Sequence, residues 1–153
     1  MPNRCVVCEE TIGSQARLCT RCKTLRDRPE QRKGWKKDPK AREKRMRKQW
    51  DAPTGAFLCH YTGLPLKTEP ENDGNYGPLY ATWEHRDPRS PSRASQVVLV
   101  GWLINDMKTD LTEQQFERMV KALASRLSNK RVPIDPKALP RRWRRGKQKK
   151  IPG

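Results

Sequence analysis

Residues 83–88 read WEHRDP and residues 96–112 read QVVLVGWLINDMKTDLT, and these two stretches decide the fold of the middle of the chain. They contain a carboxylate next to a histidine, Glu84 and His85, and an asparagine further on, Asn105. Each of these residues alone has an ordinary structural explanation, since a histidine at a strand end is commonly a surface residue and an asparagine at a helix start is commonly a cap. Their spacing along the predicted strands and helix indicates that the three residues belong to one structural unit.

The sequence around these residues predicts a strand–loop–strand–helix unit. Residues 79–83 are typical of a strand that leads into the acid–histidine pair, and residues 86–95 contain two prolines and predict a loop. The β-branched run 97–100 predicts the returning strand, and residues 102–108 predict a short helix. The unit places the acid–histidine pair at the end of the first strand and the asparagine about one turn into the helix.

A longer helix follows, and its first turn carries good start signals. Thr112 and Gln115 are spaced as a capping box, and Leu111 and Phe116 are spaced as a hydrophobic staple. Apolar residues then recur at helical spacing, and we expect the face that they form to be buried. This face consists of Phe116, Met119, Val120, Leu123 and Leu127.

From Phe57 to Phe116 the chain resembles the HNH endonucleases, a ββα-metal family found in phages and mobile elements. The resemblance rests on residues 59–66, CHYTGLPL, and on WEHRDP with its proline three residues after the histidine. It also rests on the β-branched strand that is followed by Asn105 and Lys108. The order and spacing of these short motifs carry the resemblance together.

The resemblance implies hydrolysis of phosphodiester bonds in DNA, as in homing and other mobile-element nucleases. His85 matches the general base of the family, and Glu84 and Asn105 match the positions that hold one divalent ion. Hydrolysis needs an activated water and a cation beside the phosphate, and a neutral imidazole accepts a proton near neutral pH. Oxygen ligands suit Mg²⁺ or Mn²⁺. Arg86 and Lys108 are candidates to stabilise charge on the phosphate.

The chain departs from the family pattern in three ways. Many members clamp the ββα unit with a structural zinc, but here Thr62, Gly101 and Ile104 replace three of the four ligands and only Cys59 is left. Gln96 stands where the family usually has an asparagine, and a glutamate replaces the aspartate before the histidine. We therefore expect no zinc in this unit and packing by apolar side chains instead. These side chains are Trp83, Trp102, Leu103 and Phe116.

Four of the five cysteines form two Cys-x-x-Cys pairs, Cys5 with Cys8 and Cys19 with Cys22. Two such pairs can place four thiolates around one ion, which predicts one structural zinc and leaves no open position for a substrate. Two disulfides or redox dithiols are the alternatives, but disulfides require an oxidising compartment that nothing else in the sequence indicates. Such a finger could contact either nucleic acid or a protein.

Positive charge is concentrated at the two ends of the chain. Residues 1–50 carry 16 basic and 6 acidic side chains and residues 130–153 carry 10 and 1, whereas residues 51–129 have a net charge of −2. A formal net charge of +17 distributed in this way predicts a polyanion partner, most commonly nucleic acid. Tryptophans within the basic runs, Trp50 included, could stack on bases. The predicted nucleic-acid contacts are Trp35, Lys36, Lys37, Arg45, Arg47, Lys48, Arg141, Arg142, Trp143, Arg144 and Arg145.

The predicted fold class is α+β, with a small ββα-metal (HNH) core, an N-terminal four-cysteine zinc finger and basic extended or helical arms. The predicted domains are a zinc finger over 1–25, a basic arm over 26–53, an HNH-like domain with its following amphipathic helix over 54–129, and a basic tail over 130–153. Segments as polar as the arms can fold on binding a nucleic acid, and whether they fold alone stays open. DNA is the expected partner, and RNA stays open.

The sequence contains no apolar run long enough for a membrane span. We also expect no signal peptide, because Cys5 and Cys8 stand where its apolar region would be. We therefore expect an intracellular, cytoplasmic protein of a bacterium or a phage-infected host cell. The alternative to a nuclease is a non-catalytic, zinc-containing DNA- or RNA-binding protein with a degenerate HNH fold. An adaptor that binds only proteins would leave the charge at both ends unexplained.

Overall fold

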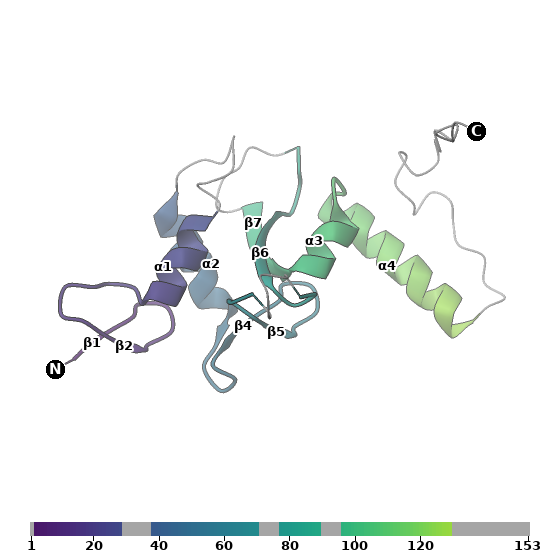
Figure 1. Ribbon diagram of the computed structural model, residues 1–153. Helices are drawn as coiled ribbons and strands as arrows, with labels where there is room; N and C mark the ends of the chain where they lie inside the picture. Colours follow the sequence, from purple (N-terminus) through teal and green to yellow (C-terminus); the bar gives the residue numbers. More distant parts are fainter. Residues whose placement is uncertain (1, 29–37, 71–76, 90–95, 130–153) are drawn as a thin grey trace, which may run out of the picture. The chain divides into compact units, whose positions relative to one another are not determined.

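The computed structural model describes residues 2–28, 38–70, 77–89 and 96–129 (Figure 1). Within these ranges the fold is mixed α+β, with small antiparallel sheets and no helix that is long and apolar enough to cross a membrane. The strands are β1 (Asn3–Arg4), β2 (Thr11–Ile12), β3 (Trp50–Asp51), β4 (Ala56–Leu58), β5 (Pro65–Leu66), β6 (Ala81–His85) and β7 (Val97–Gly101). The helices are α1 (Thr20–Asp27), α2 (Pro39–Gln49), α3 (Trp102–Lys108) and α4 (Glu113–Ser128).

The chain divides into two compact units, Met1–Thr109 and Asp110–Gly153, and the boundary falls inside the segment 54–129 that we predicted as one domain. The β6–β7 hairpin lies at the centre of the first unit, with α1 and α2 on one side of it and α3 on the other (Figure 1). Its strands pair antiparallel, with His85 opposite Val97, and α3 begins directly after β7. The predicted strand–loop–strand–helix order is confirmed, but the first strand ends at His85, so the acid–histidine pair lies within the strand.

β7 is buried along its whole length, although it belongs to a sheet of only two strands. The outer N–H and C=O groups of such a strand need partners when they are buried. At Leu99 the His60 N–H donates to the carbonyl oxygen at 3.0 Å, and further partners come from the Gln49 side chain at the end of α2. Its Nε2 donates to the carbonyl oxygens of Leu58 at 2.9 Å and Leu99 at 2.8 Å, and its Oε1 accepts from the Leu99 N–H at 3.0 Å. Gln49 therefore pairs with the outer edge of β7 at Leu99 and connects α2 to β4 and β7.

The hydrophobic core of the first unit is continuous from the cysteine pairs to the hairpin. It includes Leu25 of α1, Met46 of α2, Phe57 of β4 and Trp83 of β6. α2 is thus folded against the body of the unit, with the Asp38 side chain capping its first turn at 3.1 Å from the N–H of the third helical residue. The part of the arm over 26–53 that forms this helix is therefore folded without a nucleic acid.

α4 begins with the predicted capping box, in which the side chains and backbone groups of Thr112 and Gln115 bond reciprocally. Phe116 and Met119 are buried, as expected. The expectation of one fully buried face is wrong further along, because burial is confined to the first two turns: Val120 is 39% and Leu127 is 81% exposed.

α3 also differs from its predicted packing, because Leu103 is 51% exposed. The helix instead turns Ile104 and Lys108, which are four residues apart, toward the inside of the unit. Leu103 therefore does not contribute to the apolar packing that we expected of it.

Gln49→Ala is expected to lower the free energy of unfolding by about 2 kcal/mol, because it leaves the buried Leu99 N–H without its acceptor. Urea unfolding followed by tryptophan fluorescence measures the change. Lys48→Ala, an exposed neighbour on the same helix, is the control and should change the free energy by less than about 0.5 kcal/mol. Equal losses in the two variants would show that Gln49 has no special part in closing the edge of β7.

Candidate functional site

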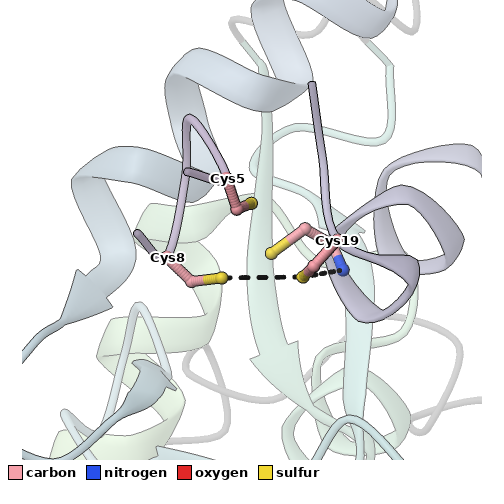
Figure 2. Close-up of side chains that lie close together, drawn as sticks. Cys5, Cys8 and Cys19 are labelled. Carbon is pink, nitrogen blue, oxygen red and sulfur yellow. Dashed lines mark hydrogen bonds between the residues drawn. The ribbon is translucent and has the colours of Figure 1, made fainter. Parts of the chain in front are cut away.

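The four cysteines of the two pairs converge at one point. Cys5 and Cys8 lie between β1 and β2, Cys19 is the N-cap of α1, and Cys22 lies in the first turn of that helix. Their sulfur atoms all lie within 4.8 Å of one another, and all four residues are buried. Figure 2 shows the Sγ atoms of Cys5, Cys8 and Cys19 facing one another.

The spacing of the sulfurs fits a tetrahedral metal site. Zn–S bonds of about 2.3 Å place the corners of such a tetrahedron about 3.8 Å apart, and the Sγ atoms of Cys8 and Cys19 are 3.6 Å apart. All five cysteines of the chain are free, so the sulfurs are not joined as disulfides. The cluster can hold a metal such as Zn²⁺, and four sulfur ligands leave no open position for a substrate.

Burial changes how readily the thiols lose their protons. It raises the pKa of Cys19 to about 11 and also raises the pKa of Cys22. At Cys5 burial acts in the same direction, but hydrogen bonds with backbone groups of Cys8, Cys19 and Val7 outweigh it and lower the pKa to about 7. Thiols must lose their protons to bind a metal, so metal affinity falls as the pH falls.

The cysteine finger is docked on the hairpin through α1. Trp83 Nε1 donates at 2.8 Å to the carbonyl oxygen of Leu25, and both residues are buried. Arg28, which follows α1, donates at 2.6 Å to the carbonyl oxygen of Ala81, and its guanidinium lies 4.6 Å from the centre of the Tyr80 ring. The cysteines at the start of α1 are therefore linked through one short helix to β6, the strand that carries the acid–histidine pair.

A buried carboxylate connects α2 to the same helix. Glu43 is 3% exposed and accepts hydrogen bonds from Arg17 at 2.8 Å and from Arg26 at 2.9 Å. Arg26 also bonds to Asp27 at 2.6 Å, which raises the pKa of Arg26 and lowers the pKa of Asp27. The finger, α1 and α2 are thus connected through one buried carboxylate as well as a common core.

We expect the purified protein to carry about one zinc ion per chain and Cys8→Ser to lose it, because the finger is too small to fold without its metal. Elemental analysis after gel filtration measures the metal, and the absorption of the cobalt-substituted protein reports the sulfur ligands. Cys59→Ser is the matched control, since Cys59 is buried but lies outside the cluster, and it should keep the metal. Metal that stays in Cys8→Ser at full occupancy contradicts the assignment.

The predicted catalytic residues lie where the end of β6 meets α3. Lys108 Nζ is 3.1 Å from Glu84 Oε1 and also donates to the backbone carbonyl of His85. Lys108 is 0% exposed and Glu84 is 7% exposed. We had predicted that Lys108 stabilises charge on the phosphate. Its buried ammonium group instead holds the Glu84 carboxylate and the end of β6.

The two faces of β6 have different neighbours, because side chains alternate along a strand. Glu84 faces α3, whereas Trp83 faces α1. By the same alternation, His85 lies on the same face of β6 as Trp83, and it is partly exposed there. His85 is the last residue of β6, so Glu84 and His85 lie on opposite faces at the end of this strand.

The first turn of α3 is hydrogen-bonded to the segment that comes directly before β6. It has no side-chain cap at Gly101, and the N–H of Trp102 instead donates to the carbonyl oxygen of Tyr80 at 2.9 Å. A side chain at position 101 would have no room, because a Cβ there would lie 2.7 Å from the Pro78 carbonyl oxygen. This attachment fixes Asn105, partly exposed, one turn before the buried lysine.

The other predicted site residues take varied positions. Arg86 is partly buried, and its N–H donates at 2.8 Å to the Gln96 carbonyl oxygen, which extends the strand pairing at the loop end of the hairpin. Arg45 is partly buried, whereas Arg47 and Lys48 are exposed. The predicted contacts that lie outside the described residues are Trp35, Lys36, Lys37, Arg141, Arg142, Trp143, Arg144 and Arg145.

Trp50 is held by the protein itself. Its ring packs edge-on against Phe57 with 5.0 Å between the ring centres, and the Arg21 guanidinium lies 5.1 Å from the ring centre. Its ring is therefore part of the packing between the finger and β4, and not the free stacking surface that we had considered for it.

Gln49 and Arg28 shape the site, yet nothing in the local sequence indicates their part. Both lie in basic runs, where long polar side chains are usually solvated. Their partners Leu99 and Ala81 lie 50 and 53 residues further along the chain. Only the folded structure brings these pairs together.

No family model matches this chain. Neither a curated protein nor a solved structure matches it. The site is therefore interpreted from its own residues and their contacts.

Lys108→Met is expected to lower the free energy of unfolding by about 3 kcal/mol or more, because it leaves the Glu84 carboxylate buried without its cation. Adding Glu84→Gln should restore part of this loss, because the uncompensated charge is then removed. Urea unfolding of the four proteins of this double-mutant cycle measures the coupling. Strictly additive effects would mean that the ion pair does not form in solution.

Proposed function

We propose that this chain is a metal-dependent endonuclease of the HNH (ββα-metal) type that hydrolyses phosphodiester bonds in DNA. The observation that supports it is the ββα unit of β6, β7 and α3. Glu84 and His85 end the first strand of this unit, and Asn105 lies on its helix. The resemblance of residues 57–116 to the HNH family assigns roles to the same three residues.

His85 is the proposed general base. Its side chain is partly exposed at the end of β6, so water and a phosphate could both reach it. A neutral imidazole accepts the proton of the attacking water near pH 7, and the leaving oxygen takes a proton from solvent. The backbone carbonyl of His85 is held by Lys108, which limits movement of the strand end that carries the base.

Glu84 and Asn105 are the proposed ligands of Mg²⁺ or Mn²⁺. The bound ion would stabilise the negative charge that develops on the phosphate. Both side chains offer oxygen atoms, which suit a hard cation. Lys108 contacts Oε1 of Glu84, so Oε2 is the oxygen that this ion pair does not use and that would face the ion. Water would have to fill the remaining coordination positions, as is usual for Mg²⁺.

The other charged groups have supporting parts in this proposal. Lys108 is a positioning residue, because it touches the Glu84 carboxylate and the strand end and is itself fully buried. Of the two cations predicted to contact the phosphate, Arg86 is then the one that remains a candidate. The four-cysteine cluster has a structural part, since α1 connects it to β6 through the Trp83 indole and Leu25.

A non-catalytic DNA- or RNA-binding protein with a degenerate HNH fold is the second candidate. The observation that favours it is the buried ion pair between Lys108 and Glu84, because this pair neutralises the carboxylate that a divalent ion would need. In that case the ββα unit is a scaffold, and the exposed cations of the chain carry the function.

Supercoiled plasmid incubated with the wild-type protein and Mg²⁺ or Mn²⁺ should be nicked or linearised, and His85→Ala should slow this at least about 100-fold, as expected for loss of a general base. His60→Ala is the matched control. It removes the only other histidine of the chain, whose exposed ring packs edge-on against Tyr61, and it should cleave at the wild-type rate.

Time courses on agarose gels measure both rates. Cleavage that persists in His85→Ala would remove this residue from the mechanism. A wild-type protein that binds DNA and cuts none, with either metal, would favour the non-catalytic candidate.

A further inference from the structure

α2 has a face that carries only positive charge. Its exposed residues are Lys40, Lys44, Arg47 and Lys48, which we call the α2 ridge. In the part of the chain that the structure describes, none of these four side chains forms an ion pair or a hydrogen bond. The one carboxylate of the helix, Glu43, is buried and bonded to two arginines, so it does not neutralise the ridge.

Helical geometry separates the α2 ridge from the buried face of α2. With 3.6 residues per turn, the four cations fall within an arc of about 100°. Arg42, Glu43 and Met46 are buried, and they fall outside this arc. From Lys40 to Lys48 the ridge is about 12 Å long. This length corresponds to about three or four phosphates of one DNA strand, which follow one another every 3.4 Å along the duplex axis.

The α2 ridge is held rigidly in the same compact unit as the hairpin. Met46 anchors the helix in the core, and Gln49 bonds to Leu58 and to Leu99 of β7. A folded helix presents its charges without the loss of chain entropy that a disordered arm suffers on binding. The ridge therefore keeps a constant position relative to β6 and β7.

We propose that the α2 ridge binds the phosphate backbone of a DNA duplex. The choice of DNA rests on the proposed function, whereas the binding surface rests on four exposed cations that have no partner among the described residues. Phosphate contacts position a protein on a duplex without reading its sequence, so the ridge should hold duplexes of any sequence. Arg45, which we predicted as a contact, is partly buried and has other interactions, and it is not part of the ridge.

The test compares two full-length variants that lose the same amount of charge. The ridge variant changes Lys40, Lys44, Arg47 and Lys48 to glutamine, which keeps a high helix propensity. The control variant changes four exposed cations elsewhere to glutamine, namely Arg4, Lys23, Arg118 and Lys121. Fluorescence anisotropy with a labelled duplex of random sequence, in buffer without Mg²⁺, gives the association constant over a series of NaCl concentrations. Circular dichroism checks that both variants are folded.

The slope of log association constant against log salt should become shallower by about three in the ridge variant, because each lost phosphate contact removes about 0.9. The control should change this slope by less than about one. Equal changes in the two folded variants, or no change in either, overturn the α2 ridge as a binding surface.

Duplex RNA in the same series tests the choice of partner. A slope that depends on the ridge with RNA, and not with DNA, overturns DNA as the ligand of the ridge. The nuclease proposal is judged separately by plasmid cleavage. A ridge-dependent slope in a protein that cuts no DNA supports the ridge and counts against the nuclease.

Discussion

Burial of the β6–β7 hairpin on both faces is the constraint on which the rest of the first unit depends. Two-stranded hairpins are marginal alone in water, so the geometry at the end of β6 is set by what covers it. On one face Trp83 bonds to Leu25 of α1, and on the other Glu84 pairs with Lys108 of α3. The cysteine finger therefore supports the hairpin, and a metal bound to the cysteines would stabilise β6 without touching it.

Charged side chains form ion pairs inside the first unit and an exposed basic face on its surface. Inside the unit, the buried carboxylates of Glu43 and Glu84 pair with cations and hold α2 and α3 in place, at a desolvation cost that only complete pairing offsets. On the surface, the α2 ridge keeps its charge available for a partner. The middle of the chain has a net charge of −2, which suits a divalent ion better than a polyanion. Affinity would then come from the basic flanks and chemistry from the hairpin.

Features that depend on neighbouring residues could be predicted from the sequence: the two cysteine pairs, the hairpin, α3 and the capping box of α4. The clamp of Gln49 on Leu99 could not, because its partners are 50 residues apart. A helix at α2 falls within the predicted extended or helical arms, but its packing against the core could not be predicted, because Met46 is its one buried apolar side chain and the rest of its buried face is polar. Leu127 was predicted to be buried and is exposed, because apolar periodicity identifies the apolar face of a helix but does not show whether anything covers that face.

We propose that the corner between β6 and α3 binds a divalent ion, separately from a metal in the cysteine cluster. Anomalous diffraction tests it most directly, with crystals soaked in Mn²⁺ and data collected at the zinc and manganese absorption edges. We predict a zinc peak among Cys5, Cys8, Cys19 and Cys22 and a manganese peak beside Glu84 and Asn105. Crystals with an occupied cysteine site and no manganese at the end of β6 would contradict the claim.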